Sequence, residues 1–292
     1  MTGRAARLRL VTGRDLPAGD PETRFLSQVL SETGWSVDIA VWSDPNIAWG
    51  DADLTVLRST WDYPDHLDAF LAWCDRAAGQ TALHNPPALV AGNVDKRYLT
   101  ALSRSGVPVV PTRWLAEPTP AALAALRTAE GWPHLVVKPA VGIDGLGVHR
   151  WPAGEERAPI AYAGRRHGWI VQPYVSSVRT HGERSVVLVD GEATWSVEKR
   201  PGLDGPDIRV QERWGGSTRN VESDAEADAL AGRTLAACCP DGAPLYARVD
   251  LLIWEGRWHV TEVELIEPSL YLLDIRARAL TLDAALRRRL DP

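Results

Sequence analysis

The chain has very little lysine: of its 32 basic residues only Lys96, Lys138 and Lys199 are lysines, and the other 29 are arginines. Since arginine supplies positive charge everywhere else, we expect these lysines to stand where arginine does not fit. A lysine ammonium is a compact point charge with three rotatable donors, which suits phosphate oxygens. The alternative is compositional drift, in which the three lysines share no role.

The chain also has few cysteines, no long apolar run and no excess of positive charge. Cys74, Cys238 and Cys239 are too few and too poorly spaced for a disulfide framework or a zinc site, so we expect them to pack in the core of a cytoplasmic protein. No apolar run approaches the roughly 18 residues of a membrane span, and Met1 to Val11 lacks the apolar core of a signal peptide. The formal net charge of −6 argues against broad nucleic-acid binding. We therefore expect a small-molecule substrate, with no nucleic-acid or membrane partner.

The expected strands and helices divide the chain into three segments, residues 1–92, 93–170 and 171–292. Strands and helices alternate in the first segment, which predicts a parallel α/β layer. A turn-rich link, residues 84–92, ends this segment, and the third segment is rich in strands with hairpin turns at Gly191 and Gly256. The expected strands cover residues 7–11, 37–41, 54–57, 108–114, 135–137, 148–151, 169–171, 185–189, 193–197, 246–254 and 258–264. The expected helices cover residues 22–33, 67–76, 93–104, 121–129, 224–237 and 273–290.

Three loops are candidates for contact with a ligand. Ligands of a parallel sheet bind beyond the carboxyl ends of its strands, where residues 12–14 and 58–63 lie. The third loop, residues 199–216, is long, polar and rich in glycine. We interpret it as a mobile lid that closes over a substrate; a plain surface loop is the alternative.

A glycine-rich loop follows the apolar run that ends at Lys138. Gly142, Gly145 and Gly147 give this loop the freedom to fold its backbone amides over phosphate oxygens, with Lys138 projecting toward the same anions. No Gly-Lys-Ser/Thr follows, so the loop is not a Walker A motif. An ordinary tight turn is the alternative.

An acidic hairpin lies near the C-terminus. Strand alternation puts Glu262 and Glu264 on one face of their strand, and Arg248 and Asp250 on one face of the preceding strand. Three converging carboxylates repel one another unless a cation is present. Oxygen-rich ligation suits Mg²⁺, which takes one or two carboxylates together with phosphates and water. A solvated acidic face is the alternative, but the apolar neighbours of these residues favour the metal.

Five motifs in this order resemble the ATP-grasp superfamily. They are Asn93-Val94-Asp95-Lys96 before a helix, Val107-Pro108 with Pro111-Thr112, Val137-Lys138-Pro139 with its glycine loop, Val171-Gln172-Pro173-Tyr174-Val175, and Arg248-Val249-Asp250 with Glu262-Val263-Glu264. The resemblance implies an α/β ATP-grasp fold. In that fold an N-terminal parallel α/β domain, 1–92, precedes two α+β lobes, 93–170 and 171–292, which clasp ATP.

The resemblance also implies a role for each matched residue. Lys96 and Lys138 would contact the phosphates, the glycine loop would cover them, and Glu183 would bind the ribose hydroxyls. Arg248 and Lys199 would be catalytic, stabilising the transferred phosphoryl group. The ATP-binding residues would be Lys96, Lys138, Gly142, Gly145, Gly147, Gln172, Tyr174, Val175 and Glu183. The Mg²⁺ ligands would be Asp250, Glu262 and Glu264.

One position departs from the family pattern. The superfamily usually has Glu-x-Asn where this chain has Glu262-x-Glu264. The extra negative charge should tighten Mg²⁺ binding, and it leaves open how Glu264 ligates the ion. Glu267 follows three residues later, and we interpret it as structural or substrate-facing rather than as a metal ligand.

The implied reaction is the activation of a carboxylate by ATP. The γ-phosphoryl group passes to a carboxylate oxygen, and an amine or hydroxylamine-like nitrogen then displaces phosphate and forms a C–N bond. The expected substrate is a small, amino-acid-like molecule held by Arg58, Ser59, Arg200 and Ser269. Residues 57–63 and 264–272 resemble the small stand-alone enzymes of the D-cycloserine-forming type, which close a ring on O-ureido-D-serine. The alternatives are a ligase that joins two molecules, a small-molecule kinase and a nucleotide-binding regulator without turnover.

Overall fold

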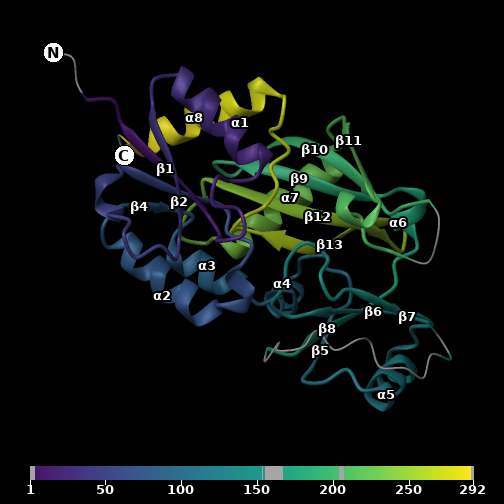
Figure 1. Cartoon of the computed structure of the whole chain (residues 1–292). Coiled ribbons are helices and arrows are strands. Elements are labelled where there is room, and N and C mark those ends of the chain that lie inside the picture. The colour runs from purple at the N-terminus through teal and green to yellow at the C-terminus, as the bar shows by residue number, and fades with distance from the viewer. Residues whose placement is uncertain (1–3, 153, 155–166, 204–206, 291–292) are drawn as a thin grey trace.

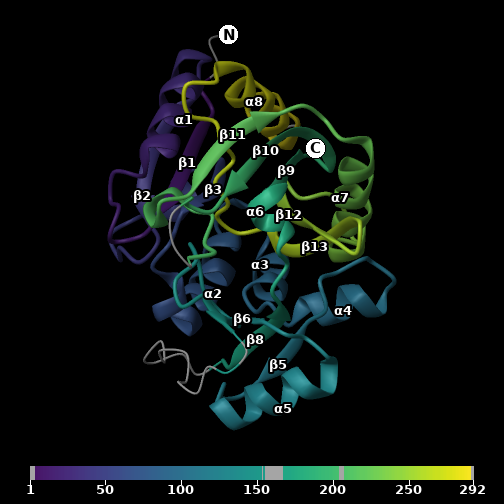
Figure 2. The ribbon, with the colours of Figure 1, turned by 90° about the vertical axis from the view of Figure 1, so that its right-hand side faces the viewer.

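Three β-sheets organise the residues that the computed structural model describes, which are 4–152, 154, 167–203 and 207–290 (Figure 1). The strand orders are β2-β1-β3-β4 in the first sheet, β5-β8-β6-β7 in the second and β11-β10-β9-β12-β13 in the third. Each sheet comes from one stretch of the chain. Figure 2 shows the second sheet and its helix α5 below the other two sheets.

The first sheet is parallel throughout its described pairings, as the alternation of strands and helices predicted. Helix α1 begins after Asp20, whose side chain accepts hydrogen bonds from the backbone N–H groups of Glu22 and Thr23 and so caps the helix. The strands are β1 (Arg7–Thr12), β2 (Ser36–Val41), β3 (Leu54–Ser59) and β4 (Ala82–His84). The helices of this stretch are α1 (Pro21–Glu32), α2 (Leu67–Ala78) and the short 3-10 turns η1 (Trp49–Asp51) and η2 (Tyr63–Asp65).

The chain returns to the first sheet at its other end. Helix α8 (Arg276–Leu290) lies beside α1 in Figure 1, and its Leu282 and Leu286 share one apolar core with Leu26 and Leu30. Burial of such leucines stabilises a fold by about 1.5–3 kcal/mol per side chain. The first layer therefore depends on residues from both ends of the sequence.

The second sheet is antiparallel in its described pairings and is covered by helix α5 (Pro120–Glu130). Leu123 on that helix is fully buried against the sheet core. The strands are β5 (Arg113–Leu115), β6 (Leu135–Pro139), β7 (His149–Trp151) and β8 (Trp169–Pro173). Strand β8 crosses the expected division at residue 170, so we propose to place that division after β8; the three-segment description itself stays a prediction.

The third sheet is antiparallel in its described pairings, and it has the two hairpin turns predicted at Gly191 and Gly256. Both glycines and the residues before them, Asp190 and Glu255, have positive φ, as tight two-residue hairpins require. The strands are β9 (Glu183–Val189), β10 (Glu192–Arg200), β11 (Ser217–Val221), β12 (Tyr246–Trp254) and β13 (Arg257–Glu264). The helices of this stretch are α6 (Ser177–Thr180), α7 (Ala225–Cys238) and the 3-10 turn η3 (Glu212–Trp214).

Alternation along β9 shows how the third sheet serves two cores. Val186 and Leu188 pack with α7 on one face, whereas Val187 and Val189 pack with α1 and α8 on the other. On this second face, the residue that precedes Val187 toward the start of β9 is the polar residue Ser185. The polar end of this face carries the candidate site.

The structure differs from the expected elements between residues 84 and 114. The link expected to consist of turns contains helix α3 (Pro87–Asn93). Pro87 can begin this helix because a residue in the first turn needs no partner for its backbone N–H, which proline lacks. Helix α4 (Tyr98–Arg104) begins later than expected. The strand expected over 108–114 shrinks to β5, since prolines at 108 and 111 interrupt the ladder; Val109 forms only an isolated bridge to Val260.

The cysteines behave as expected of core residues. Cys74, Cys238 and Cys239 carry free thiols, and Cys74 and Cys239 lie inside apolar clusters. Among the described helices, none has the length and apolarity needed to cross a membrane.

Asn85, directly after β4, ties the first sheet to the third. Its side-chain amide donates to the carbonyl oxygens of Tyr246 at 2.9 Å and Leu265 at 2.7 Å. Its side-chain oxygen accepts from the N–H of Leu245 at 2.9 Å. The side chain is fully buried, so these backbone groups have no water to replace it.

We predict that Asn85→Ala destabilises the protein by about 2–4 kcal/mol, because each buried polar group left unpaired costs about 1–3 kcal/mol. Chemical denaturation measures the free energy of unfolding. Asn46→Ala, the same change at an exposed position, should alter it by no more than about 0.5 kcal/mol. A loss below about 1 kcal/mol in Asn85→Ala would contradict this assignment.

Candidate active site

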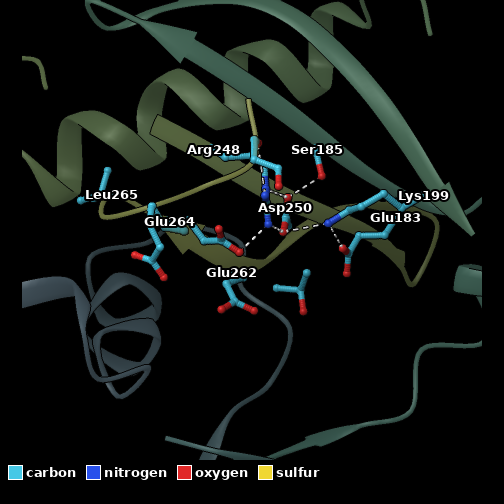
Figure 3. Close-up of polar contacts among 12 residues, drawn as sticks. Glu183, Ser185, Lys199, Arg248, Asp250, Glu262, Glu264 and Leu265 are labelled. Carbon is cyan, nitrogen blue, oxygen red and sulfur yellow. Dashed lines mark hydrogen bonds and ion pairs between the residues drawn. The ribbon is translucent and has the colours of Figure 1, made fainter. Parts of the chain in front are cut away.

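Strand register builds the site on one face of the third sheet. Asp250 on β12 stands opposite Ser185 on β9 and Glu262 on β13. Arg248 stands opposite Glu264, and Lys199 on β10 stands opposite Glu183 on β9. Directly opposite residues of antiparallel strands share a face, and Figure 3 shows these side chains pointing toward one another. The structure thus brings together the residues that strand alternation placed on one face.

Asp250 is the centre of a buried hydrogen-bond and ion-pair network. Its Oδ1 accepts from Ser185 Oγ at 2.6 Å and from Arg248 Nε at 3.0 Å, and its Oδ2 accepts from Arg248 Nη2 at 3.0 Å and from Lys199 Nζ at 3.1 Å. Lys199 Nζ also lies 2.6 Å from Glu183 Oε1. Both carboxylate oxygens of Asp250 therefore have charged or polar partners.

Opposite charges outweigh burial in setting the pKa values of Asp250 and Lys199, whereas burial outweighs them at Glu183 and Glu264. Burial alone would raise the pKa of Asp250, but Arg248 and Lys199 hold it well below its ordinary value. Burial alone would lower the pKa of Lys199, but Asp250 and Glu183 raise it. Glu264 contacts Arg248 Nη2 through Oε1, yet burial outweighs that contact and raises the Glu264 pKa to about 7.

The other two lysines converge on Glu262 from the second segment. Lys96 Nζ lies 3.1 Å from Glu262 Oε1 and donates to the carbonyl oxygen of Gly142 at 2.7 Å. Lys138 Nζ lies 3.8 Å from Glu262 Oε2 and donates to the carbonyl oxygen of Thr261 at 3.3 Å. A bulge between β12 and β13 leaves Thr261 outside the pairing register. Burial lowers the pKa of Lys138, and the charge of Glu262 opposes that shift.

Two adjoining pockets open over this face in the described part of the chain. The first lies under the glycine loop and extends to the chain after β8, and its lining includes Lys138, Glu183 and Asp250. The second lies toward the first sheet, and its lining includes Trp61, Glu267 and Ser269. The residues that line both pockets are Lys96, Gly142, Ile143, Asp144, Gln211, Arg248, Glu262 and Glu264.

Comparison with known proteins gives the family. The family model for the N-terminal domain of the D-cycloserine synthetase DcsG matches residues 8–85. The cycloserine biosynthesis protein DcsG of Streptomyces lavendulae is 33% identical over 282 residues, which are 91% of this chain and 93% of that protein. The chain belongs to the DcsG family. A crystal structure of D-cycloserine synthetase DcsG superposes with a TM-score of 0.82 at 30% identity, covering 98% of this chain and 100% of that one.

The wider fold is that of the ATP-grasp ligases. The D-alanine–D-alanine ligase of Bacillus anthracis matches with a TM-score of 0.70 over 98% of this chain and 99% of its own, at 15% identity, which shows the fold alone. The α/β ATP-grasp fold predicted from the motifs is therefore confirmed. As a member of the DcsG family, the chain is an ADP-forming ATP-grasp ligase of C–N bonds.

Most of the residues matched to ATP binding line the first pocket of this DcsG-family chain. They are Lys96, Lys138, Gly142, Gly145, Gln172, Tyr174, Val175 and Glu183. Gly147 lies in the same loop with a φ of +74° but does not belong to the lining. The roles assigned to these residues stay predictions, with the structure supplying their common location.

Residues 207–216, within the expected lid, lie against the glycine loop. Arg213 Nη1 lies 2.6 Å from Asp144 Oδ2, and Trp214 Nε1 donates to the carbonyl oxygen of Asp144 at 2.9 Å. Gly145 leaves room for Gln211, which would lie only 2.7 Å from a Cβ at that position. The structure thus brings this segment over the first pocket; its movement as a lid stays a prediction.

The structure places only some of the expected substrate residues at the second pocket. Ser269 lines the second pocket. Arg58 does not: it is 3% exposed and lies within hydrogen-bond distance of Glu22, at 2.5 Å. Ser59 is buried against Thr12. Arg200 pairs with Glu198 and belongs to neither pocket. The end of the strand that carries Arg58 and Ser59 belongs to the core, whereas Trp61 and Tyr63, in the chain after it, line the second pocket.

Two site residues were missed by the motif reasoning. Ser185 stands two residues after Glu183 on β9, so strand alternation could have placed it beside Asp250. Tyr98 lines the second pocket, and its hydroxyl donates to the carbonyl oxygen of Val263 at 2.8 Å. No spacing rule joins residues 98 and 263, so only the tertiary structure shows that contact.

The carboxylates of this DcsG-family site do not form a ready metal cage. Among the described residues, no group of three His, Cys, Asp or Glu side chains is placed to hold a metal ion. Asp250, Glu262 and Glu264 each contact a basic side chain instead. Their hard oxygen donors fit Mg²⁺, provided that phosphate oxygens supply the remaining ligands.

We predict that Lys138→Arg lowers kcat/KM for ATP by about 10-fold or more although the charge is kept, because the wide guanidinium fork does not fit a buried site built for one ammonium. Steady-state ADP release measures this. Arg104→Lys, on the exposed end of α4, is the control and should keep activity. Near-normal turnover in Lys138→Arg would refute a phosphate-binding role.

Proposed function

We propose that the chain closes the ring of D-cycloserine from O-ureido-D-serine, with ATP and Mg²⁺, through an acyl-phosphate intermediate. The relative from Streptomyces lavendulae supports this product, since it is a cycloserine biosynthesis protein. The observation that carries the reaction type is the shared wall of the two pockets, which holds Lys96, Arg248, Glu262 and Glu264. A terminal phosphate in the first pocket and a carboxylate in the second would meet at this wall.

The nucleotide would lie in the first pocket. Lys96, Lys138 and the glycine loop would bind its phosphates, and Glu183 its ribose hydroxyls. Asp250, Glu262 and Glu264 would hold Mg²⁺, which when bound neutralises charge on the transferring phosphoryl group. With every group ionised the site is electrically balanced, since Lys96, Lys138, Lys199 and Arg248 stand beside Glu183, Asp250, Glu262 and Glu264. A triphosphate would upset that balance, so entry of a divalent cation with it is favourable.

The chemistry follows from this placement. A carboxylate oxygen of the substrate attacks the γ-phosphorus and ADP leaves, with Arg248 and Lys199 stabilising the negative charge. The ureido nitrogen that is bonded to oxygen then loses its proton, attacks the acyl carbon, closes the ring and releases phosphate. Water finally hydrolyses the N-carbamoyl group, which leaves as carbamate and decomposes into CO₂ and ammonia, so that the ring carries a free N–H. The protein positions and neutralises, which requires no covalent bond to the chain.

The cytoplasm is the expected place for this reaction. Three free thiols suit a reducing compartment, and the same compartment supplies ATP.

We predict that O-ureido-D-serine, ATP and Mg²⁺ together give ADP, phosphate and a cyclic product in equal amounts. Mass spectrometry and coupled ADP release measure these products. ADP release that requires a second, amine-bearing molecule would instead indicate a ligase that joins two molecules. A stable phosphorylated substrate would indicate a kinase, and no ADP with any acid tested would indicate a regulator.

We further predict that Glu264→Asn raises the Mg²⁺ concentration for half-maximal activity by about 3- to 30-fold, since one anionic ligand is lost. Turnover should recover in excess Mg²⁺. Glu255→Asn makes the same carboxylate-to-amide change at the exposed turn of this hairpin and should leave the Mg²⁺ requirement unaltered. An unchanged requirement in Glu264→Asn would remove Glu264 from the ligand set.

A further inference from the structure

One acidic side chain of the second pocket stands apart from the others. Glu262 lies beside Lys96, Glu264 beside Arg248 and Asp144 beside Arg213. Glu267 has no ion pair or side-chain hydrogen bond within the described part of the chain, although it is 92% buried, being 8% exposed. The carboxylates that line this pocket are thus matched by basic side chains except at Glu267.

An unpaired buried carboxylate calls for a cation or a proton. Removing an ionised carboxylate from water is strongly unfavourable unless a partner compensates. Burial, with a contribution from the charge of Glu264, raises the pKa of Glu267 to about 8. In the protein alone Glu267 therefore binds a proton near neutral pH, and a cationic ligand would take the place of that proton.

The position of Glu267 favours an organic cation over the metal. Glu267 lines the second pocket and not the first, where the triphosphate would lie and where Asp250 is found. The aromatic side chains Trp61 and Tyr63 line the same pocket, and Trp61 Nε1 donates to the backbone carbonyl oxygen of Glu267 at 3.4 Å. A carboxylate beside aromatic rings is a favourable setting for an ammonium group, which gains both an ion pair and cation–π attraction.

The backbone that carries Glu267 is held in place by residues far away in the sequence. Glu22 accepts from the N–H of Leu270 at 2.8 Å and of Leu272 at 2.9 Å. The hydroxyl of Tyr246 donates to the carbonyl oxygen of Ile266 at 2.8 Å. The loop is therefore anchored on both sides of Glu267, which suits a residue that must meet a ligand in one geometry.

We propose that Glu267 binds the α-ammonium group of the amino-acid substrate and so selects amino acids over carboxylic acids that lack the amine. This inference rests on the proposed function, which places the nucleotide and the substrate's carboxylate. It adds the side chain that binds the substrate's amine. The substrate's amine and carboxylate share one carbon atom, so an ammonium at Glu267 would hold the carboxylate near the shared wall of the two pockets.

The test compares acids that differ only in the amino group. Isothermal titration of the protein, loaded with Mg²⁺ and a non-hydrolysable ATP analogue, uses two pairs: O-ureido-D-serine with 3-(ureidooxy)propanoate, and D-serine with 3-hydroxypropanoate. We expect the wild-type protein to bind the amino member about 10- to 100-fold more tightly, the range for one charged hydrogen bond. In Glu267→Gln this ratio should fall to within about 3-fold.

Two controls separate binding from folding. Glu192→Gln removes a carboxylate charge at an exposed position of β10 and should keep the wild-type ratio. Glu267→Gln should unfold at the same temperature as the wild-type protein or higher, because it removes an unpaired buried acid. Equal binding of both members by the wild-type protein, an unchanged ratio in Glu267→Gln, or no binding of any of the four acids would overturn the inference.

Failure of the inference can be told from failure of the proposed function. Turnover of O-ureido-D-serine is measured in parallel on the same preparations. Ring closure with an unchanged kcat/KM in Glu267→Gln would keep the function and refute the inference. A ratio that depends on Glu267 for D-serine, without turnover of O-ureido-D-serine, would refute the function and keep the inference.

Discussion

The buried network around Asp250 is the arrangement on which the rest of the site depends. Arg248 and Lys199 stand on either side of this carboxylate, and both are almost fully buried. A buried charge is tolerated only with a partner in good geometry. Cross-strand register supplies that geometry, because Ser185 and Glu262 are the direct neighbours of Asp250 on the adjacent strands. The sheet therefore fixes the relative positions of the groups that we propose act together on one phosphoryl transfer.

The glycine loop and the first sheet then close this platform from two directions. Lys96 and Lys138 reach Glu262 from the second segment, and the loop near Gly142 is tied to Lys96. From the other side, Asn85 and Glu22 hold the chain that runs from β13 past the second pocket. The two pockets thus share a wall from the third sheet but have separate outer walls. In the proposed function, that division would let nucleotide and substrate be recognised independently while their reacting groups meet.

Local sequence patterns were most informative where chemistry and periodicity coincide. Three lysines in an arginine-rich chain pointed to anion sites, and all three lie at the same cluster of carboxylates. Drift in composition gives no reason for that convergence. The hairpin pattern of β12 and β13 likewise placed Arg248, Asp250, Glu262 and Glu264 on one face. Patterns were least informative at prolines, where a helix start at Pro87 was read as a turn.

The sequence by itself determined the fold family, most of its elements in order, and the acidic and basic residues that share one face of the third sheet. Each of these depends on short-range spacing, which a single strand or loop preserves. Only the tertiary structure decided which residues line the second pocket. Arg58 has the chemistry of a carboxylate-binding residue, yet burial beside Glu22 makes it part of the core. Glu267, by contrast, stands out as a candidate ligand-binding residue only because, among the described residues, no basic side chain forms an ion pair with it. Whether a charge is paired depends on residues hundreds of positions away, and no local pattern records them.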